Sequence, residues 1–470
     1  MKFRGVSWLL LLTLCTGLTL SQRGAAQERG ELKSSERNHT RYRFRDVGSF
    51  GGPVSYLAND ATGTGSASGV LNASGSIVSG ADTSASNPNY PNVCLLCVTT
   101  DPLVVHAFLW QNGHLADLGA RLGGNNSFAN WISPNGLIAG YSETGQIDPL
   151  IGVPAIDAVL WKQGQIIDLG TIEGGYESAA FAVNNHGKVV GGFVNTIPDA
   201  FSPFGFQVRA FAWNDGLMKD LGTLGGPEAT AYFVNERGQM AGTSFLNSTA
   251  NSVTGLPTQD PFLWENGTMI DLGTLGGTFG IPNYLDNHGR VIGQSNLAGD
   301  LSQHPFLWTK AHGMQDLGTL GGSFGQANWM NEAGEIVGFA STEGDQTRLA
   351  FLWKDNILIN LGALKAHVCS NALGINSKHQ VVGVSATTCA FTAAERHAFL
   401  WEKGEMMDLN RFLPTGADLQ QLTDAYSIND RGEIVGLGIP PGCDDEFACG
   451  HVFVLTPCQD VTSEGCADEN

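Results

Sequence analysis

Between residues 42 and 455 the chain alternates short apolar runs with polar or glycine-rich turns, in a frame that repeats. One unit runs from Asp260-Pro-Phe-Leu-Trp264 through Met269-Ile-Asp-Leu-Gly273 and Thr-Leu-Gly-Gly277 to Leu285-Asp-Asn-His-Gly289 and Arg290-Val-Ile-Gly293. The tryptophans of this frame lie 44 to 52 residues apart, at Trp110, Trp161, Trp213, Trp264, Trp308, Trp353 and Trp401. A period of this length is typical of β-propeller blades.

Each unit contains four strand candidates rich in Val, Ile, Phe and Trp. We name them in chain order the AFLW strand, the DLG strand, the strand ending in Asn, and the VVG strand. Tight turns such as Glu265-Asn-Gly267 join the first two, and Asn-x-x-Gly turns such as Asn184 to Gly187 join the last two, which predicts two hairpins per unit. Because antiparallel strands alternate direction, the GTLGG connections and the variable stretches after VVG are expected together on the opposite face.

The two ends of the repeat region complement each other. It opens with a DLG-type strand, Tyr42 to Gly48, and closes with an AFLW-type strand, His451 to Leu455. Pairing them would complete the last unit and leave no open edge. The hairpins between Asn and VVG strands then number eight, at Asn72, Asn135, Asn184, Asn235, Asp286, Asn331, Asn376 and Asn429.

The predicted fold is therefore all-β: a single β-propeller of about eight four-stranded blades, closed by pairing of the N-terminal strand with the last blade. In this phase the small-residue strands that end in Asn are innermost, where space near the axis is tightest. A β-solenoid is the alternative, although a unit with two hairpins is long for one coil. The 62 glycines and the charged fraction of 15% fit a turn-dense β structure.

Residues 1–26 have the features of a secretory signal peptide, with basic Lys2 and Arg4, an apolar run and a small-residue cleavage site ending at Ala26. Residues 27–41 then form a flexible segment, 42–455 the propeller, and 456–470 an acidic tail. No later apolar stretch reaches the roughly 18 residues of a membrane helix, so we expect a secreted protein, extracellular or periplasmic, without a membrane span. The net charge of −20 and the lack of basic clusters argue against nucleic acid as a partner, and a monomer is expected.

Eight cysteines remain after the signal peptide, an even number in a compartment where disulfides persist. They fall in close sequential pairs, and local pairing is the simplest of the many possible connectivities: Cys94 with Cys97, Cys369 with Cys389, Cys443 with Cys449, and Cys458 with Cys466. The Cys94-Leu-Leu-Cys97 spacing has no second CxxC to complete a zinc site and no βαβ setting for redox chemistry, which favours a structural link.

The repeat resembles the HAF-repeat family of bacterial extracellular proteins, whose His-Ala-Phe stands here at His106 to Phe108 and His397 to Phe399. The resemblance covers essentially all of residues 42–455 and implies export and a repeated β architecture. It implies no activity, ligand or catalytic residue. The frame departs from the family pattern mainly in the seventh and eighth units, where Asn360, the stretch Gly362 to His367, and Asp408 to Arg411 break it.

One aspartate per unit precedes a Gly-rich turn, and we interpret this set as structural, because a repeated residue serves a repeated need. A calcium site is the weaker alternative, since no DxDxDG pattern is present. The repeated tryptophans are interpreted as packing between blades, with a lectin bearing one aromatic platform per blade as the alternative. Leu and Arg replace the HAF histidine in some units, which argues against a metal ligand there.

Unique residues are the better candidates for a binding site. His367 and Lys365 stand beside Cys369 on the GTLGG face, and Asp444, Asp445 and Glu446 crowd the probable disulfide loop between Cys443 and Cys449, where a cation is one hypothesis and a solvated acidic loop the other. The variable insertions, residues 81–105, 142–156, 193–208, 243–259 and 437–450, are expected on the same face.

No nucleophile elbow, HExxH, P-loop or dinucleotide motif stands in a suitable context, so no catalytic residue, metal or cofactor is assigned. The preferred function is a secreted binding module for an extracellular ligand: a carbohydrate, a peptide or a surface component. A carboxylate-based hydrolase or lyase with its site on the insertion face remains open, because such glycosidases carry no short motif. A structural envelope protein is the third possibility.

Overall fold

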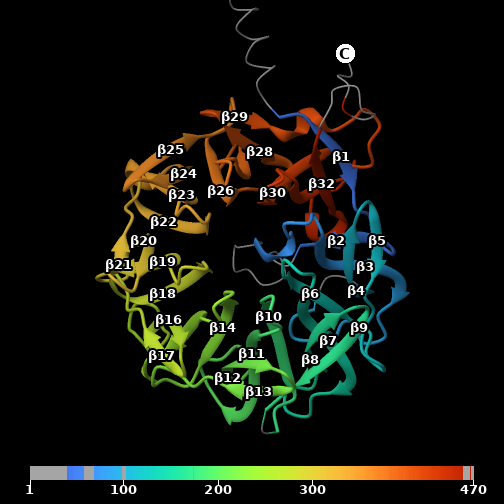
Figure 1. The fold of residues 1–470 in the computed structure, drawn as a ribbon, viewed down its shortest axis with the longest axis vertical. Coiled ribbons are helices and arrows are strands. Elements are labelled where there is room, and N and C mark those ends of the chain that lie inside the picture. The colour runs from blue at the N-terminus through green and yellow to red at the C-terminus, as the bar shows by residue number, and fades with distance from the viewer. Residues whose placement is uncertain (1–39, 58–67, 98–101, 173, 459–465, 467–470) are drawn as a thin grey trace, which may run out of the picture.

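The computed structural model describes residues 40–57, 68–97, 102–172, 174–458 and 466. Within them the strands form four-stranded antiparallel units set around a common centre, as in a β-propeller (Figure 1). Five units are separate sheets, and three more are joined by the single parallel pairs Gln259 with Phe279 and Gln303 with Phe324. The prediction of an all-β chain built from four-stranded blades is confirmed.

The four kinds of strand occupy fixed places in every unit, in the predicted order. The strands that end in Asn are innermost: β2 (Gly51–Tyr56), β6 (Ser127–Ile132), β10 (Glu177–Val183), β14 (Ala229–Val234), β18 (Gly276–Leu285), β22 (Gly321–Met330), β26 (Cys369–Ile375) and β30 (Gln421–Ile428). The VVG strands follow: β3 (Ile77–Ser86), β7 (Ile138–Ile147), β11 (Val189–Pro198), β15 (Met240–Phe245), β19 (Val291–Leu297), β23 (Ile336–Thr342), β27 (Val381–Ala386) and β31 (Ile434–Ile439).

The outer half of each unit is the hairpin of AFLW and DLG strands. The AFLW strands are β4 (Leu103–Gln111), β8 (Pro154–Lys162), β12 (Phe206–Asn214), β16 (Gln259–Glu265), β20 (Gln303–Thr309), β24 (Arg348–Lys354), β28 (Arg396–Glu402) and β32 (His451–Pro457). The DLG strands are outermost: β5 (His114–Asp117), β9 (Gln165–Gly170), β13 (Leu217–Asp220), β17 (Thr268–Asp271), β21 (Gly313–Asp316), β25 (Ile357–Gly362), β29 (Glu405–Asp408) and β1 (Tyr42–Asp46).

Helices are short and lie in the connections. They are the 3₁₀ turns η1 (Ser68–Val70), η2 (Glu343–Asp345), η3 (Ala393–Glu395) and η4 (Leu409–Phe412), and the one-turn helix α3 (Glu446–Cys449). None of the helices in the described part of the chain has the length and apolarity needed to cross a membrane. The expected signal peptide with its cleavage after Ala26, most of the 27–41 segment and most of the 456–470 tail lie outside the described residues.

The N-terminal strand pairs with the last unit, as the complementary chain ends predict. β1 lies antiparallel to β32, with Phe44 opposite Leu455 and Asp46 opposite Phe453. The last unit also contacts the first, where the Ser55 N–H donates to the carbonyl of Gly450 at 3.0 Å. In Figure 1 the blue β1 therefore lies beside the red β32.

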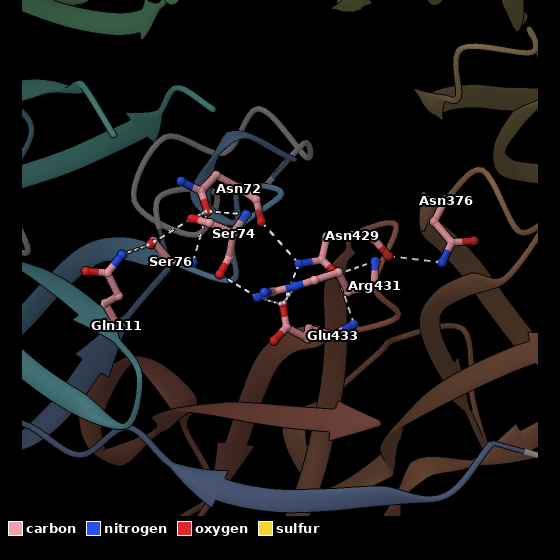
Figure 2. Close-up of polar contacts among 8 residues, drawn as sticks. All are labelled: Asn72, Ser74, Ser76, Gln111, Asn376, Asn429, Arg431 and Glu433. Carbon is pink, nitrogen blue, oxygen red and sulfur yellow. Dashed lines mark hydrogen bonds and ion pairs between the residues drawn. The ribbon is translucent and has the colours of Figure 1, made fainter. Parts of the chain in front are cut away.

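Asparagines at the inner hairpins link neighbouring units through side-chain hydrogen bonds. The Asn376 amide Nδ2 donates to the carbonyl of Asn429 at 3.0 Å, and Asn429 Nδ2 donates to the carbonyl of Asn72 at 3.1 Å, across 357 residues of sequence (Figure 2). The same bond recurs from Asn184, Asn235 and Asn331 to the next unit, at 2.8–3.1 Å. The asparagine Oδ1 meanwhile accepts the N–H groups of its own turn, so each side chain shapes one hairpin and binds the next.

Two units achieve this link with other residues. In the second unit the corner residue is Ser133 instead of the predicted Asn135, because Ser133 exchanges backbone hydrogen bonds with Leu137 and Gly136. Asn135 still donates across, to the carbonyl of Asn185 at 2.8 Å. In the fifth unit the Asp286 carboxylate accepts the turn N–H groups, and Arg290 supplies the donor, to the carbonyl of Glu332 at 3.0 Å.

The core lies between adjacent sheets and is built from the AFLW strands. Their phenylalanines are fully buried in seven units: Phe108, Phe211, Phe262, Phe306, Phe351, Phe399 and Phe453. Five of the seven repeated tryptophans are also buried, at Trp110, Trp161, Trp213, Trp308 and Trp353. Packing between blades is therefore their role, and the alternative of one exposed aromatic platform per blade is wrong.

The four expected disulfides are present. They join Cys94 to Cys97, Cys369 to Cys389, Cys443 to Cys449, and Cys458 to Cys466. Three of them close loops on the insertion side of the units, and the fourth follows β32. Because cysteine pairs of this kind persist only where the environment is oxidising, their presence is consistent with a secreted or periplasmic protein.

Removing residues 1–47 should destabilise the protein and promote self-association, because β32 then presents an unpaired edge. We expect a fall in melting temperature of several degrees or more and higher-mass species in size-exclusion chromatography with light scattering. Removing residues 1–39 leaves β1 intact and is the control. Identical melting and mass for the two truncations would contradict a stabilising role for the β1–β32 pair.

Candidate functional site

The aspartates at the ends of the DLG strands have the structural role that their repetition suggests. Each accepts the N–H two residues further on, as Asp168 does from Gly170 at 2.8 Å. The same contact, at 2.6–2.8 Å, is made by Asp46, Asp117, Asp220, Asp271, Asp316 and Asp408. Asn360, which replaces the aspartate in its unit, makes it too, from Gly362 at 2.8 Å.

The histidine of the HAF motif contacts this same aspartate in its own unit, a role that sequence reasoning did not assign. The Nδ1–carboxylate distances are 2.6–2.9 Å for His106 with Asp117, His304 with Asp316, His397 with Asp408 and His451 with Asp46. Hydrogen bonding to Asp408 raises the pKa of His397, and hydrogen bonding to Asp46 raises that of His451. The histidines thus belong to the frame of the blades.

Units without this histidine place different residues opposite the end of the DLG strand. Arg209 forms an ion pair with Asp220 at 3.1 Å. Where the histidine is replaced by Leu349, the aspartate is replaced by the uncharged Asn360. Asp260 faces Asp271, and burial together with the neighbouring charge raises the pKa of Asp260 to about 7.

A cavity of about 590 Å³ lies at the centre of the ring, between the innermost strands. Strands β6, β10, β14, β18 and β22 all contribute to its wall, and four of the five predicted insertions reach it, with residues such as Leu96, Ile156, Phe204 and Gln259. The expectation that the insertions gather at one mouth therefore holds for these four. Its volume and its mixed apolar and polar lining make the cavity the default candidate for a binding site.

Aromatic side chains line the inner part of the cavity. Trp131 from β6 crosses toward Phe233 from β14, with ring centroids 6.3 Å apart, and Phe181 lies 5.7 Å from Tyr232. Gly69 makes room for the indole, because a Cβ at this position would lie 1.9 Å from Trp131 Cε3. Trp131 therefore packs among the innermost strands and also forms part of the cavity wall.

Glu177 enters the cavity from the first position of β10 and is almost fully buried. Its Oε2 accepts the Ile156 N–H at 3.1 Å, and its Oε1 has no hydrogen-bond partner among the described residues. Burial raises the pKa of Glu177 to about 9, the Ile156 N–H opposes this rise, and the buried carboxyl of Asp148 adds to it. Glu177 is therefore a neutral carboxylic acid at physiological pH.

Glu228 occupies the same place in the next unit, just before β14. Burial raises the pKa of Glu228 to about 7, while a hydrogen bond from Ser202 lowers it and the charge of Asp199 raises it. In the unit before Glu177, Asn126 Oδ1 accepts the Val105 N–H at 2.9 Å. At this repeat position one side-chain oxygen accepts a backbone N–H. Where the residue is a glutamate, as at Glu177 and Glu228, the second carboxyl oxygen has no such partner among the described residues.

The cavity wall contains several buried oxygens without a hydrogen-bond partner. Glu177 Oε1, Glu228 Oε1, Asn130 Oδ1 and Gln294 Oε1 are all buried without a partner in the part of the chain that the structure describes, and all four residues line the cavity. The amide Nδ2 of Asn130 is used, donating to the carbonyl of Ala180 at 2.9 Å. Because buried polar atoms are costly when unpaired, these four favour a ligand rich in hydroxyl groups, which donate to the amide oxygens of Asn130 and Gln294 and accept from the protonated carboxyl of Glu177.

The residues singled out from the sequence lie elsewhere. His367 Nδ1 is 3.1 Å from Ser385 Oγ, and its ring packs edge-on against His397 with centroids 5.0 Å apart. Burial, followed by the charge of His397, lowers the pKa of His367. Lys365 is exposed, and neither His367 nor Lys365 is among the residues that line the central cavity. Ser385 is fully buried, accepts the Leu364 N–H at 3.0 Å and donates to the carbonyl of Cys369 at 3.3 Å, so its hydroxyl is held within the fold.

The acidic disulfide loop is only partly available for a ligand. Glu446 forms an ion pair with Arg396, which also lies 3.5 Å from Asp424. Asp444 and Asp445 are exposed, and the carbonyl of Asp445 accepts the Ala448 N–H at the start of α3. Glu446 therefore holds the loop to its neighbour, and cation binding by this loop stays a prediction.

Two groups of described residues have the spacing of metal ligands, and neither favours a metal. Cys94, Cys97 and Glu143 form one group, but the two sulfurs are joined in a disulfide. Asp286, His288 and Glu332 form the other, on the hairpin face, where Arg290 already forms an ion pair with Asp286 at 2.5 Å.

No family model and no curated protein sequence matches the chain. Among solved structures, the β-propeller domain of the Trilobed protease from Pyrococcus furiosus is similar at 11% identity and a TM-score of 0.39, over 65% of this chain and 90% of that one. Pyrococcus horikoshii acylaminoacyl peptidase is similar at 11% identity and a TM-score of 0.41, over 78% of this chain and 56% of that one. A Xanthomonas campestris gluconolactonase is similar at 11% identity and a TM-score of 0.27, over 58% and 83%.

Glu177→Gln should flatten the dependence of stability on pH. Between about pH 4.5 and 9 the folded protein retains the Glu177 proton that the unfolded chain releases, so the free energy of unfolding falls as pH rises through this window. Glutamine cannot ionise, so the variant should equal the wild type near pH 5 and exceed it by about 1 to 3 kcal/mol near pH 8. Melting temperatures across this range test it, with exposed Glu343→Gln as control; parallel curves for wild type and Glu177→Gln would contradict it.

Proposed function

We propose that this chain is a secreted binding module whose central cavity takes a neutral, hydroxyl-rich segment of an extracellular carbohydrate. The observation that carries the proposal is the set of four oxygens in the cavity wall without a hydrogen-bond partner among the described residues, Glu177 Oε1, Glu228 Oε1, Asn130 Oδ1 and Gln294 Oε1. Sugar hydroxyls can donate to the amide oxygens and accept from a protonated carboxyl. The aromatic rings beside them, Trp131 among them, offer the flat apolar surface that the C–H face of a sugar ring packs on.

The charge state of the cavity supports a neutral ligand. Glu177, with its pKa raised to about 9, is uncharged at pH 7, and Glu228, with its pKa raised to about 7, is partly so. An anionic ligand would gain nothing from this wall, and a cation would meet a carboxyl that resists ionisation. A peptide and a surface component are the other ligand classes that a binding module of this kind could take.

Hydrolysis is the second candidate, favoured by the same two carboxyls. A glycosidase needs a carboxylic acid that donates a proton and a carboxylate that acts as base or nucleophile. Glu177 fits the acid, but burial raises the pKa of Glu228 as well, which weakens it as the second group. Binding without cleavage is therefore the function that we prefer, and a structural envelope protein is the third possibility.

We further propose that the eight units form one closed propeller and that the protein is a monomeric, exported member of the HAF-repeat family. The β1–β32 pairing and the Asn429–Asn72 hydrogen bond support closure. The four disulfides support export. The His-Ala-Phe and DLGTLGG sequences support the family.

A glycan array followed by isothermal titration calorimetry tests the carbohydrate proposal. We expect saccharide binding without release of shortened products. Gln294→Leu removes one acceptor from the wall and should weaken binding about tenfold or more. The matched control is Gln111→Leu, because Gln111 is exposed and lies on the hairpin face. His367→Ala and Lys365→Ala should bind as the wild type does.

Three results would contradict the proposal in different ways. Release of shortened sugars would replace it with the hydrolase. Binding that is lost in His367→Ala but kept in Gln294→Leu would move the site away from the cavity. Absence of binding to any saccharide would leave a peptide ligand or the structural role.

A further inference from the structure

A second pocket, of about 350 Å³, lies at the start of β24 on the insertion side of the ring. Gln303, Phe324, Phe339 and Thr347 line it together with Arg348, the first residue of β24. None of its lining residues is shared with the central cavity. What is argued for this pocket therefore does not depend on carbohydrate binding at the centre.

Arg348 is held between aromatic rings. Its guanidinium carbon lies 4.4 Å from the ring centre of Phe391 and 5.2 Å from that of Phe339. Phe391 belongs to the loop that the Cys369–Cys389 disulfide ties to β26, and the Arg348 N–H points at Cys369 Sγ at 3.4 Å. The two rings hold the guanidinium, and the disulfide holds the loop that carries Phe391. Little side-chain freedom of Arg348 would therefore be lost on binding.

This arginine has no acidic partner among the described residues. None lies within ion-pair distance of it, and its buried Nε has no hydrogen-bond partner there. Burial lowers the pKa of Arg348, with no acid acting in the opposite direction. A partly buried cation of this kind is costly for the fold unless another group compensates it.

The equivalent arginine of the next unit, Arg396, is paired with acidic residues and has a structural role. Arg396 is the first residue of β28, as Arg348 is of β24, and it is held by Glu446 and by Asp424 at 3.5 Å. Burial lowers its pKa too, but the two acids more than offset this and raise it. Arg348 keeps the cation and lacks both acids.

One acid does line the pocket. Asp345 is exposed, and its Oδ1 accepts the Ser323 N–H at 2.6 Å and the Ser341 hydroxyl at 2.5 Å. These donors lower its pKa and hold the carboxylate at the end of η2. The carboxylate is therefore bound to Ser323 of β22 and Ser341 of β23, and it forms no ion pair with the guanidinium of Arg348.

We propose that this pocket binds the carboxylate of a small organic ligand, with Arg348 as its recognition residue. A guanidinium donates two parallel N–H bonds to a carboxylate, and this fork is the geometry that arginine offers best. Phe324 and Phe339 supply apolar surface for the rest of the ligand, and Gln303 and Thr347 supply polar contacts at the rim. The carboxylate comes from a uronic acid or from the C-terminus of a peptide, which share this chemistry.

Titration calorimetry at low salt, with four probes, tests the proposal. D-glucuronate represents the uronic acid, N-acetylglycine the peptide terminus, D-glucose the uncharged sugar, and sulfate an anion of other shape. We expect at least one of the two carboxylates to bind, and glucose and sulfate to bind much more weakly. Binding of glucuronate alone identifies the saccharide source, and binding of N-acetylglycine alone the peptide source.

Arg348→Gln should weaken carboxylate binding about tenfold or more. Arg348→Lys keeps the charge and loses the fork, so it should retain part of the affinity and also keeps the test open if the glutamine variant does not fold. Arg237→Gln is the control, since Arg237 is exposed at a hairpin turn. Equal binding of sulfate and carboxylate, unchanged affinity in both Arg348 variants, or no binding of either carboxylate would overturn the proposal. Loss of saccharide binding in Gln294→Leu, with glucuronate binding intact, would show that the two sites act separately.

Discussion

Neighbouring blades are held in register by the hydrogen bond from an inner-hairpin asparagine to the backbone carbonyl of the next unit. Most blades share no strand pairing with their neighbours. This buried hydrogen bond therefore fixes the relative position of two blades, which apolar packing alone would leave adjustable. Its position explains why asparagine recurs there: one side chain must accept from its own turn and donate to the neighbour. In the fifth unit these two roles are divided: Asp286 accepts the N–H groups of the turn, and Arg290 donates to the next unit.

The frame could be predicted from the sequence because every element of it recurs. The Asn-x-x-Gly turns and the DLG aspartates recur along the chain, so their roles could be compared between units. The two ends of the repeat region could be compared with each other. The central cavity could not be predicted in this way. Glu177 resembles any acid before a strand, and only the structure shows that Asp148, from an insertion loop, lies beside it and that one of its oxygens is left over.

The residues that look unusual in the sequence do not line the central cavity. His367 is unique, yet it packs on His397 within the frame. Glu177 and Glu228 occupy a repeated position, and Arg348 differs from Arg396 only in what surrounds it. The two sites that we propose each include a repeated position without its usual partner, and local sequence patterns do not connect such positions with the residues that surround them.

The pairing of β1 with β32 has a consequence for how the chain matures. Each inner strand finds its neighbours within its own unit, but Phe44 must wait for Leu455, close to the end of the repeat region. The entropic cost of bringing the two strands together grows by only about 0.6 kcal/mol for each doubling of the loop length. The long sequence separation therefore affects the rate of folding more than the final stability. Because a chain is synthesised from its N-terminus, β1 remains without its partner strand until β32 has been made, and the last unit is completed only when both ends of the repeat region are present.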